Sequence, residues 1–121
     1  MEENISTTRT MRPIGRLRFS GKNTQGNNSP TLYATERDTF IVQGWRTEQL
    51  NYVEISHPLL GFLEPGTCLG APLTDTGHGT FTLTGDAVTD PQVLAQMDIP
   101  DFETCVEVPR GKEIRGGAVT G

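Results

Sequence analysis

The sequence predicts a mainly β domain of the α+β class: a small sandwich or barrel of two hairpin-based halves, with one short helix and flexible termini. Three observations predict it. Apolar residues gather between Leu32 and Val108, in short runs rich in the β-branched and aromatic residues that favour strands. The chain contains 14 Gly and 8 Pro, which is typical of many turns. The clearest helix signal lies at 90–97.

Several runs of strand-forming residues stand between polar or glycine-rich segments. The first two, 31–35 and 39–45, are separated by the polar triplet 36–38 and are expected to form a hairpin. Three further runs predict strands: 52–55, 80–84 and 103–108. The predicted core consists of the apolar residues of these segments, of 58–63 and of the helix: Leu32, Phe40, Val42, Val53, Ile55, Leu60, Leu63, Phe81, Leu83, Val93, Leu94, Met97, Val106 and Val108.

Alternation along the last strand assigns its residues to two faces. Its inward face is expected to be Thr104, Val106 and Val108. Cys105 falls on the same face as Glu103 and Glu107. Because two of these three side chains are charged, this face is predicted to be exposed and the thiol is not expected to be buried.

The helix signal combines a cap, a start and a stop. Asp90 is expected to cap the helix, Pro91 takes its first position, and Pro100 ends it. An apolar stripe lies between them: Val93, Leu94 and Met97. Elsewhere, 58–63 is predicted to form one helical turn, and the tetrapeptide 64–67 has the Pro and Gly positions of a type II turn.

A weak internal repeat links two parts of the chain. Residues 38–44 align without gaps on 79–85, and 52–56 align on 105–109. If the repeat is real, two half-size units that cannot each bury a core pack together around a pseudo-twofold axis. The identities are few, so coincidence is the alternative.

Charge divides the chain into a flexible basic arm at 1–30, a globular domain at 31–109 and a flexible tail at 110–121. The arm carries five Lys or Arg and two acids, a net +3. Within it, 14–19 alternates apolar and basic residues, as a half-buried edge strand would. Residues 31–108 carry two arginines and twelve acids, a net −10, and the remaining residues carry a net +2. Such an acidic body repels nucleic acid and anionic membranes and attracts basic partners.

The expected location is the cytoplasm. The sequence has no apolar run of about 20 residues for a membrane span, and its start lacks the pattern of a secretory leader. Two cysteines are too few for a disulfide scaffold, so both thiols are expected to be reduced.

Residues with catalytic or metal-binding chemistry are scattered. His57, Cys68, His78 and Cys105 lack the close ligand pairs of structural zinc sites. A trio of Asp75, His78 and Cys105 could be drawn for nucleophilic catalysis, but glycines flank His78 and a turn residue is the simpler interpretation. A Cys68–Cys105 disulfide is disfavoured by a reducing compartment. We therefore predict no catalytic residues, no cofactor and no metal.

Two segments carry a resemblance to a known group of proteins. Residues 33–45, which read YATERDTFIVQGW, and the segment 88–109, with its TDP, LAQMDIPD and ETCVEVP phrases, resemble small uncharacterised actinomycete proteins. The resemblance implies an actinobacterial accessory protein kept beside helix-turn-helix regulators. It implies no catalytic residues.

A second resemblance concerns 53–77. Its VxI, LxPGT and DxG phrases are similar to the AbrB-type swapped-hairpin DNA-binding domain. That family has a longer spacer and basic residues for phosphate contact, whereas this stretch contains no Lys or Arg. DNA binding would therefore depend on the basic arm.

Three classes of function follow. The first is an interaction module for a basic protein partner, such as a DNA-binding regulator, with Glu103 and Glu107 on its surface and Trp45 lining an interface. The alternative is a small β-barrel enzyme or ligand-binding protein of a bacterial biosynthetic pathway, whose apolar pocket would leave no sequence motif. The third is nucleic-acid binding through the arm. A homodimer is also possible, because so small a core is marginally stable alone.

Overall fold

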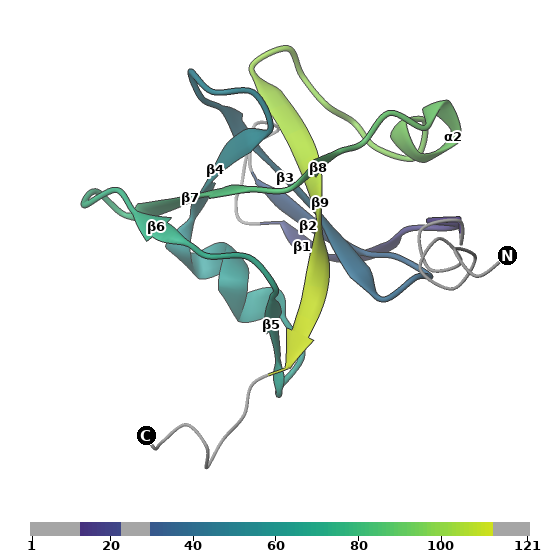
Figure 1. The fold of residues 1–121 in the computed structure, drawn as a ribbon, viewed down its shortest axis with the longest axis horizontal. Coiled ribbons are helices and arrows are strands. Elements are labelled where there is room, and N and C mark those ends of the chain that lie inside the picture. Colours follow the sequence, from purple (N-terminus) through teal and green to yellow (C-terminus); the bar gives the residue numbers. More distant parts are fainter. Residues whose placement is uncertain (1–12, 23–29, 113–121) are drawn as a thin grey trace, which may run out of the picture.

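The computed structural model describes residues 13–22 and 30–112 of the chain. Within these residues, nine strands form one antiparallel sheet, so the predicted mainly β class is confirmed (Figure 1). The elements, in chain order, are β1 (Arg18–Lys22), β2 (Thr31–Ala34), β3 (Thr39–Arg46), β4 (Tyr52–Ser56), the 3₁₀ helix η1 (His57–Phe62), β5 (Thr67–Leu69), β6 (Thr74–Asp75), β7 (Thr80–Thr84), β8 (Asp86–Ala87), α2 (Pro91–Leu94) and β9 (Glu103–Lys112).

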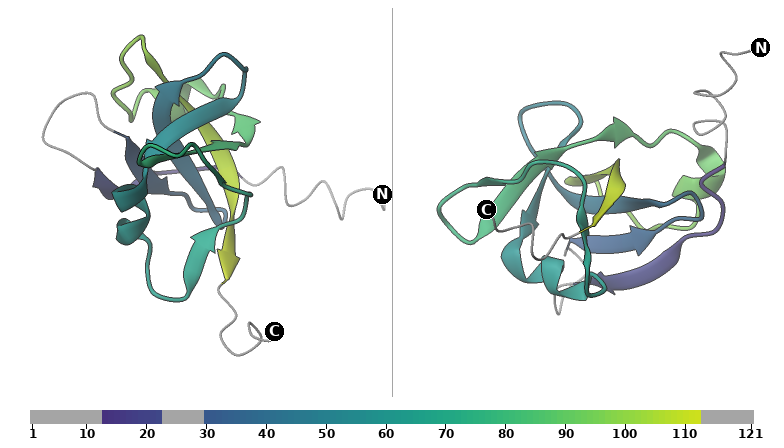
Figure 2. Two further views of the ribbon diagram at one scale, coloured as in Figure 1. Left: turned by 90° about the vertical axis from the view of Figure 1, so that its left-hand side faces the viewer. Right: turned by 60° about the horizontal axis from the view of Figure 1, so that its bottom comes forward.

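Strand β3 lies at the centre of the sheet. It pairs with β2 and β4 along one edge and with β9 along the other. Strand β4 pairs with β7, and β8, which directly follows β7 in the chain, pairs with β9. The pairings lead from β3 through β4 to β7, and the chain then continues into β8 beside β9, the other neighbour of β3. The sheet is strongly curved (Figure 2). Strands β1, β5 and β6 extend it at its margins.

The main core lies inside this curved sheet. Its buried residues are Leu32, Ala34, Phe40, Val42, Val53, Ile55, Leu59, Leu69, Leu83, Val106 and Val108. Helix η1 contacts β1, β2 and β4 and contributes Leu59, which is fully buried. Most of the predicted core residues belong to this cluster or pack against it, because period-2 alternation assigns each strand residue to a face.

The strand pairing follows the internal alignment found in the sequence. In the first half, Trp45 pairs with Glu54. In the second half, their counterparts Asp86 and Glu107 pair in the same way. The ladder between β3 and β9 also matches the ladder between β7 and β4, pair by pair. The two halves are therefore interlocked, since β4 pairs with β3 of its own half and β7 of the other, and β9 pairs with β8 of its own half and β3 of the other.

Two glycines occupy equivalent places where the halves interlock. A Cβ atom on Gly44 would lie 2.5 Å from the backbone oxygen of Glu54. A Cβ atom on Gly85 would lie 2.5 Å from the backbone oxygen of Glu107. Side chains do not approach backbone this closely, so each half needs a residue without Cβ at this position.

Ring contacts repeat between the halves as well. The guanidinium of Arg110 lies 5.9 Å from the ring centre of Phe40. Between their counterparts, the ring of His57 lies 4.1 Å from that of Phe81. The backbone N–H groups of Arg110 and His57 both donate to the last residue of the neighbouring hairpin turn, at 3.1 Å each.

A second apolar cluster covers the outer face of β3 and β9. Its buried members are Ile14, Ile41, Val93 and Cys105. Partly buried residues pack against them: Leu17, Tyr33, Val88, Leu94, Met97 and Ile99. Helix α2 and the segments on either side of it supply much of this cover, and α2 lies at the end of the molecule opposite β6 (Figure 1).

The boundaries of the domain differ from the predicted ones. The arm was expected to extend to residue 30, but Ile14 is buried in the second cluster and β1 pairs with β2. The predicted tail begins at 110, but β9 continues to Lys112. Apolar Ile14 and the alternation that follows it anchor this part of the arm. The rest of the predicted arm and tail lies outside the described residues.

The local predictions for helix and turn are confirmed in part. Asp90 caps α2, because its Oδ1 accepts a hydrogen bond of 2.9 Å from the backbone N–H of Gln92. The α-helix ends at Leu94, earlier than predicted, and only turn-like bonds reach Met97. At 64–67, a φ of 83° at Gly66 and a turn-closing hydrogen bond agree with type II. No helix in the described part of the chain is long and apolar enough to cross a membrane.

Candidate functional site

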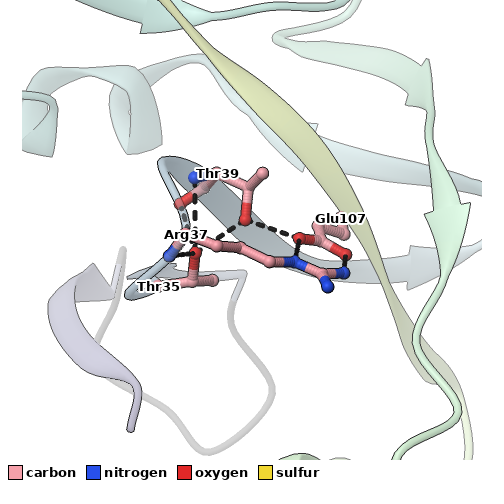
Figure 3. A network of polar contacts seen from close by, with 4 residues as sticks. All are labelled: Thr35, Arg37, Thr39 and Glu107. Carbon is pink, nitrogen blue, oxygen red and sulfur yellow. Dashed lines mark hydrogen bonds and ion pairs between the residues drawn. The ribbon is translucent and has the colours of Figure 1, made fainter. Parts of the chain in front are cut away.

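A network of polar contacts joins the β2–β3 turn to β9 (Figure 3). The carboxylate of Glu107 accepts hydrogen bonds from Arg37 on both oxygens, from Nε at 2.8 Å and from Nη2 at 2.6 Å. It also accepts one from Thr39 Oγ1 at 2.6 Å. Thr35 completes the network, with its hydroxyl 2.7 Å from that of Thr39. The arginine and the glutamate thus form a bidentate ion pair, and the hydrogen bond from Thr39 supports the carboxylate.

The pKa shifts of Glu107 and Arg37 agree with this geometry. Burial alone would raise the pKa of Glu107, but the hydrogen bonds from Arg37 and Thr39 and the charge of Arg37 outweigh it and hold the pKa below its ordinary value. The hydrogen bond to Glu107 raises the pKa of Arg37. With its side chain only 7% exposed, Glu107 is a carboxylate that the fold neutralises internally.

The residues that the internal alignment sets against this network form the same support. Glu54, the counterpart of Glu107, accepts a hydrogen bond of 2.6 Å from Thr80 Oγ1. The hydroxyl of Thr80 lies 2.6 Å from that of Thr76, as the two hydroxyls do in the first network. The backbone N–H of Thr76 donates to the carbonyl of Thr80 at 3.0 Å, closing the hairpin turn. Three of the four positions are therefore conserved between the halves in residue type and geometry.

The fourth position differs. The counterpart of Arg37 is His78, which is exposed in the turn between Gly77 and Gly79. No Lys, Arg or His of the described residues lies within ion-pair distance of Glu54. A Cβ atom on either flanking glycine would meet nothing within 4 Å, so the turn has open space around it. Among the described residues, Glu54 is thus a half-buried carboxylate that has a threonine support and no paired cation.

Glu54 borders an open hollow on the outer face of β4 and β7. The hollow has a volume of about 590 Å³. The residues that line it all have polar groups on their side chains: Thr47, Glu48, Gln49, Tyr52, Glu54, Thr74 and Thr82. In the other half the equivalent face is the one that the second apolar cluster covers. The two outer faces thus belong to equivalent pairs of strands, but one borders an open hollow and the other is covered by apolar side chains.

The predicted interaction residues lie in three different environments. Glu103 was expected on an exposed face but is 0% exposed, and Glu107 is 6% exposed. That prediction of exposure was wrong, and so was the expectation for Cys105, because the second apolar cluster covers the outer face of β9. Trp45 is partly exposed and pairs with Glu54 across β3 and β4. Sequence reasoning missed Glu54, although its alignment with Glu107 was available.

Glu103 forms a buried polar pair with Gln43. The Nε2 group of Gln43 donates to Glu103 Oε1 at 2.7 Å and to the carbonyl of Asp98 at 2.9 Å. Gln43 Oε1 and Glu103 Oε2 are buried without a hydrogen-bond partner among the described residues. Burial raises the pKa of Glu103, and the hydrogen bond from Gln43 offsets this only in part.

The Glu103→Gln variant is expected to be more stable at pH 7 by about 1–2 kcal/mol, because an amide carries no desolvated charge and can donate to a partnerless acceptor. A raised folded-state pKa means that the parent loses stability as pH rises above the ordinary value of 4.5. The gain should therefore shrink as pH falls toward that value. Urea denaturation at pH 7 and near pH 4.5 measures both. A variant that is less stable at both pH values would show that the charged form is not penalised.

The groups considered for catalysis and metal binding do not assemble into the predicted alternatives. Burial raises the pKa of Cys105 to about 11, so this thiol is protonated and a poor nucleophile near neutral pH. Asp75 lies 3.7 Å from Nε2 of His57 rather than in a trio with Cys105. Cys105 and Cys68 are both free thiols. Within the described ranges, no three His, Cys, Asp or Glu side chains gather as metal ligands.

Comparison with known proteins adds no relative. No protein-family model matches the chain, and neither a curated protein nor a solved structure matches it significantly.

Proposed function

We propose that this chain is a non-enzymatic interaction module that binds a basic segment of another protein, such as a DNA-binding regulator. The supporting observations are an uneven distribution of charge along the chain and an open hollow that two glutamates border. Residues 47–109 contain ten acids and no Lys or Arg. This stretch includes β4, β6 and β7, whose outer face carries the hollow with Glu48 and Glu54.

The proposed surface differs from the one expected from sequence. The outer face of β9 is covered, and its glutamates are used inside the domain by Arg37 and Gln43. The outer face of β4 and β7 has the same place in the fold but keeps a supported carboxylate at a polar hollow. An acidic face of this kind attracts a basic partner over long range and fixes its register at close contact.

The test is a pair of charge-matched double variants of the full chain. Glu48→Lys with Glu54→Lys changes the proposed face, and Asp98→Lys with Asp101→Lys makes the same change in net charge on the connection between α2 and β9. Binding of a labelled arginine-rich peptide is measured by fluorescence anisotropy over a range of salt concentrations. We expect the first variant to lose most binding and the second to keep most of it.

Salt provides the second readout. Parent affinity should fall as the Debye length contracts toward about 8 Å near physiological ionic strength. Equal losses in the two double variants would mean that the peptide responds only to net charge, and the proposed face would then be rejected. Circular dichroism confirms that both variants are folded.

A further inference from the structure

We propose that Glu54 is a receptor for a single arginine side chain of the partner, held as Arg37 is held on Glu107. This inference rests on the proposed function and names the group that the acidic face recognises. It starts from the internal comparison that the fold provides. Glu107 and Glu54 have the same strand pairing and the same threonine support, and one of them already holds a guanidinium.

The oxygens of Glu54 are suited to the same arrangement. Oε2 accepts the hydrogen bond from Thr80, as Oε2 of Glu107 does from Thr39. No described residue donates a hydrogen bond to Oε1 of Glu54. A guanidinium has parallel N–H groups that bond both oxygens at once, whereas an ammonium is a point charge that cannot span them. The site should therefore prefer arginine to lysine.

Space for the incoming side chain exists where the first half has its own arginine. The turn that carries Arg37 is replaced by a turn with two glycines, and neither glycine has a neighbour that a Cβ would touch. The hollow beside Glu54 opens on the same outer face. A partner's side chain can thus approach Glu54 from solvent, while the carboxylate of Glu107 is only 7% exposed and already accepts hydrogen bonds from Arg37 on both oxygens.

Trp45 adds a second contact that fits this ligand. Its counterpart in the internal alignment is Asp86, whose charge contributes to the raised pKa of Arg37. Trp45 stands beside Glu54 across the β3–β4 pair and is partly exposed. An indole face attracts a guanidinium through a cation–π contact, and arginine stacks on it better than lysine does. Trp45 therefore takes the place beside Glu54 that Asp86 takes beside Glu107.

The first experiment compares two labelled peptides of equal length and charge, one alternating Arg with Gly and the other Lys with Gly. The full parent chain is expected to bind the arginine peptide at least about fivefold more tightly. Glu54→Gln should weaken the arginine peptide by about tenfold and bring it to the level of the lysine peptide. Asp98→Asn, which removes the same charge elsewhere, should keep the preference for arginine.

The second experiment moves the turn of the first half into the second. Gly77→Glu/His78→Arg/Gly79→Asp places the residues of 36–38 at 77–79, so that Glu54 receives an arginine from its own chain. This variant is expected to lose arginine-peptide binding by about tenfold. Its thermal midpoint is expected to fall, because Gly77 and Gly79 both have a φ of 91°, which residues with a side chain rarely adopt. If this variant does not fold, peptide binding by the Glu54→Gln variant alone tests the proposal.

The outcomes distinguish a failure of the arginine receptor from a failure of the interaction module. If both peptides bind equally and the Glu48→Lys/Glu54→Lys variant loses both, the arginine receptor is rejected while the interaction module stands. If neither peptide binds the parent, the proposed function itself is rejected. A variant with Arg9→Gln and Arg12→Gln tests the chain's own arm, and a tenfold gain in its peptide affinity would show that the arm, not a partner, fills the site.

Discussion

Replacing Glu107 with lysine is expected to lower the free energy of unfolding by about 3–5 kcal/mol. The substitution removes the acceptor of both Arg37 hydrogen bonds and of the Thr39 hydroxyl. It also places a second positive charge beside Arg37, at a position that is 6% exposed. Breaking a buried ion pair by changing one partner is costly because the remaining charge stays desolvated and uncompensated.

The matched substitution in the other half is Glu54→Lys. It is expected to cost about 1 kcal/mol or less, because Glu54 is half-buried, holds no cation and loses a single hydrogen bond from Thr80. Urea denaturation of both variants gives the two free energies directly. Losses of similar size would contradict the assignment of Glu107 as a structural carboxylate and of Glu54 as an open one.

The second large effect concerns Gly44 and Gly85, which lie where the strands of the two halves interlock. Gly44→Ala and Gly85→Ala are each expected to destabilise the domain by about 2–3 kcal/mol, since the added methyl group would press on backbone that cannot move independently of the sheet. In both cases the obstructing atom is the carbonyl oxygen of a glutamate in the neighbouring strand, at 2.5 Å from the built Cβ. The two losses should be similar, because the surroundings are equivalent.

Gly61→Ala is the control for this pair. Gly61 lies in η1, and a Cβ there would meet nothing within 4 Å. This variant should be neutral or slightly stabilised, because alanine restricts the unfolded chain more than glycine does. Thermal or urea unfolding compares the three. If one of the interlock variants is as stable as the control, the two halves do not share the same packing constraint at that strand crossing.

Much of the fold could be predicted from local pattern. The run 39–45 is rich in β-branched and aromatic residues, the run 80–84 alternates as a half-buried strand does, and the observed strands occupy these places. The cap at Asp90 and the turn at Gly66 follow from side-chain chemistry that acts within a few residues. The internal alignment, weak as it is in identities, matches the registers of the strand ladders.

The second layer could not be predicted in the same way. Alternation places Glu103 and Cys105 opposite the main core, and for a sheet with one covered face that position is solvent. Here the cover comes from Ile14 and from residues around α2, which are distant in sequence. Polar residues on that face were read as exposed, although Gln43 provides a buried partner for Glu103. The shorter strands, such as β6 and β8, are too brief to have a periodic signal.

The candidate site was partly visible in the sequence. Trp45 was singled out as an interface residue because of its size and its face, and it stands beside Glu54. Glu54 itself carries no motif, since one glutamate in a strand is usually a solvated side chain. The only indication in the sequence comes from the internal alignment, which sets Glu54 against Glu107 and His78 against Arg37. That difference has meaning only once the ion pair of Arg37 and Glu107 is seen.

The most direct test of an arginine-binding acidic face is an amide NMR titration of the full chain with the Arg-Gly peptide. The largest shift changes are expected at Trp45, Glu54 and Thr80 and along the outer face of β7, and Glu54→Gln should abolish them. The amides around Glu107, whose carboxylate is already paired with Arg37, should change little. Changes centred on β9 or on the β2–β3 turn, or spread evenly over the acidic surface, would contradict the assignment of Glu54 as the receptor.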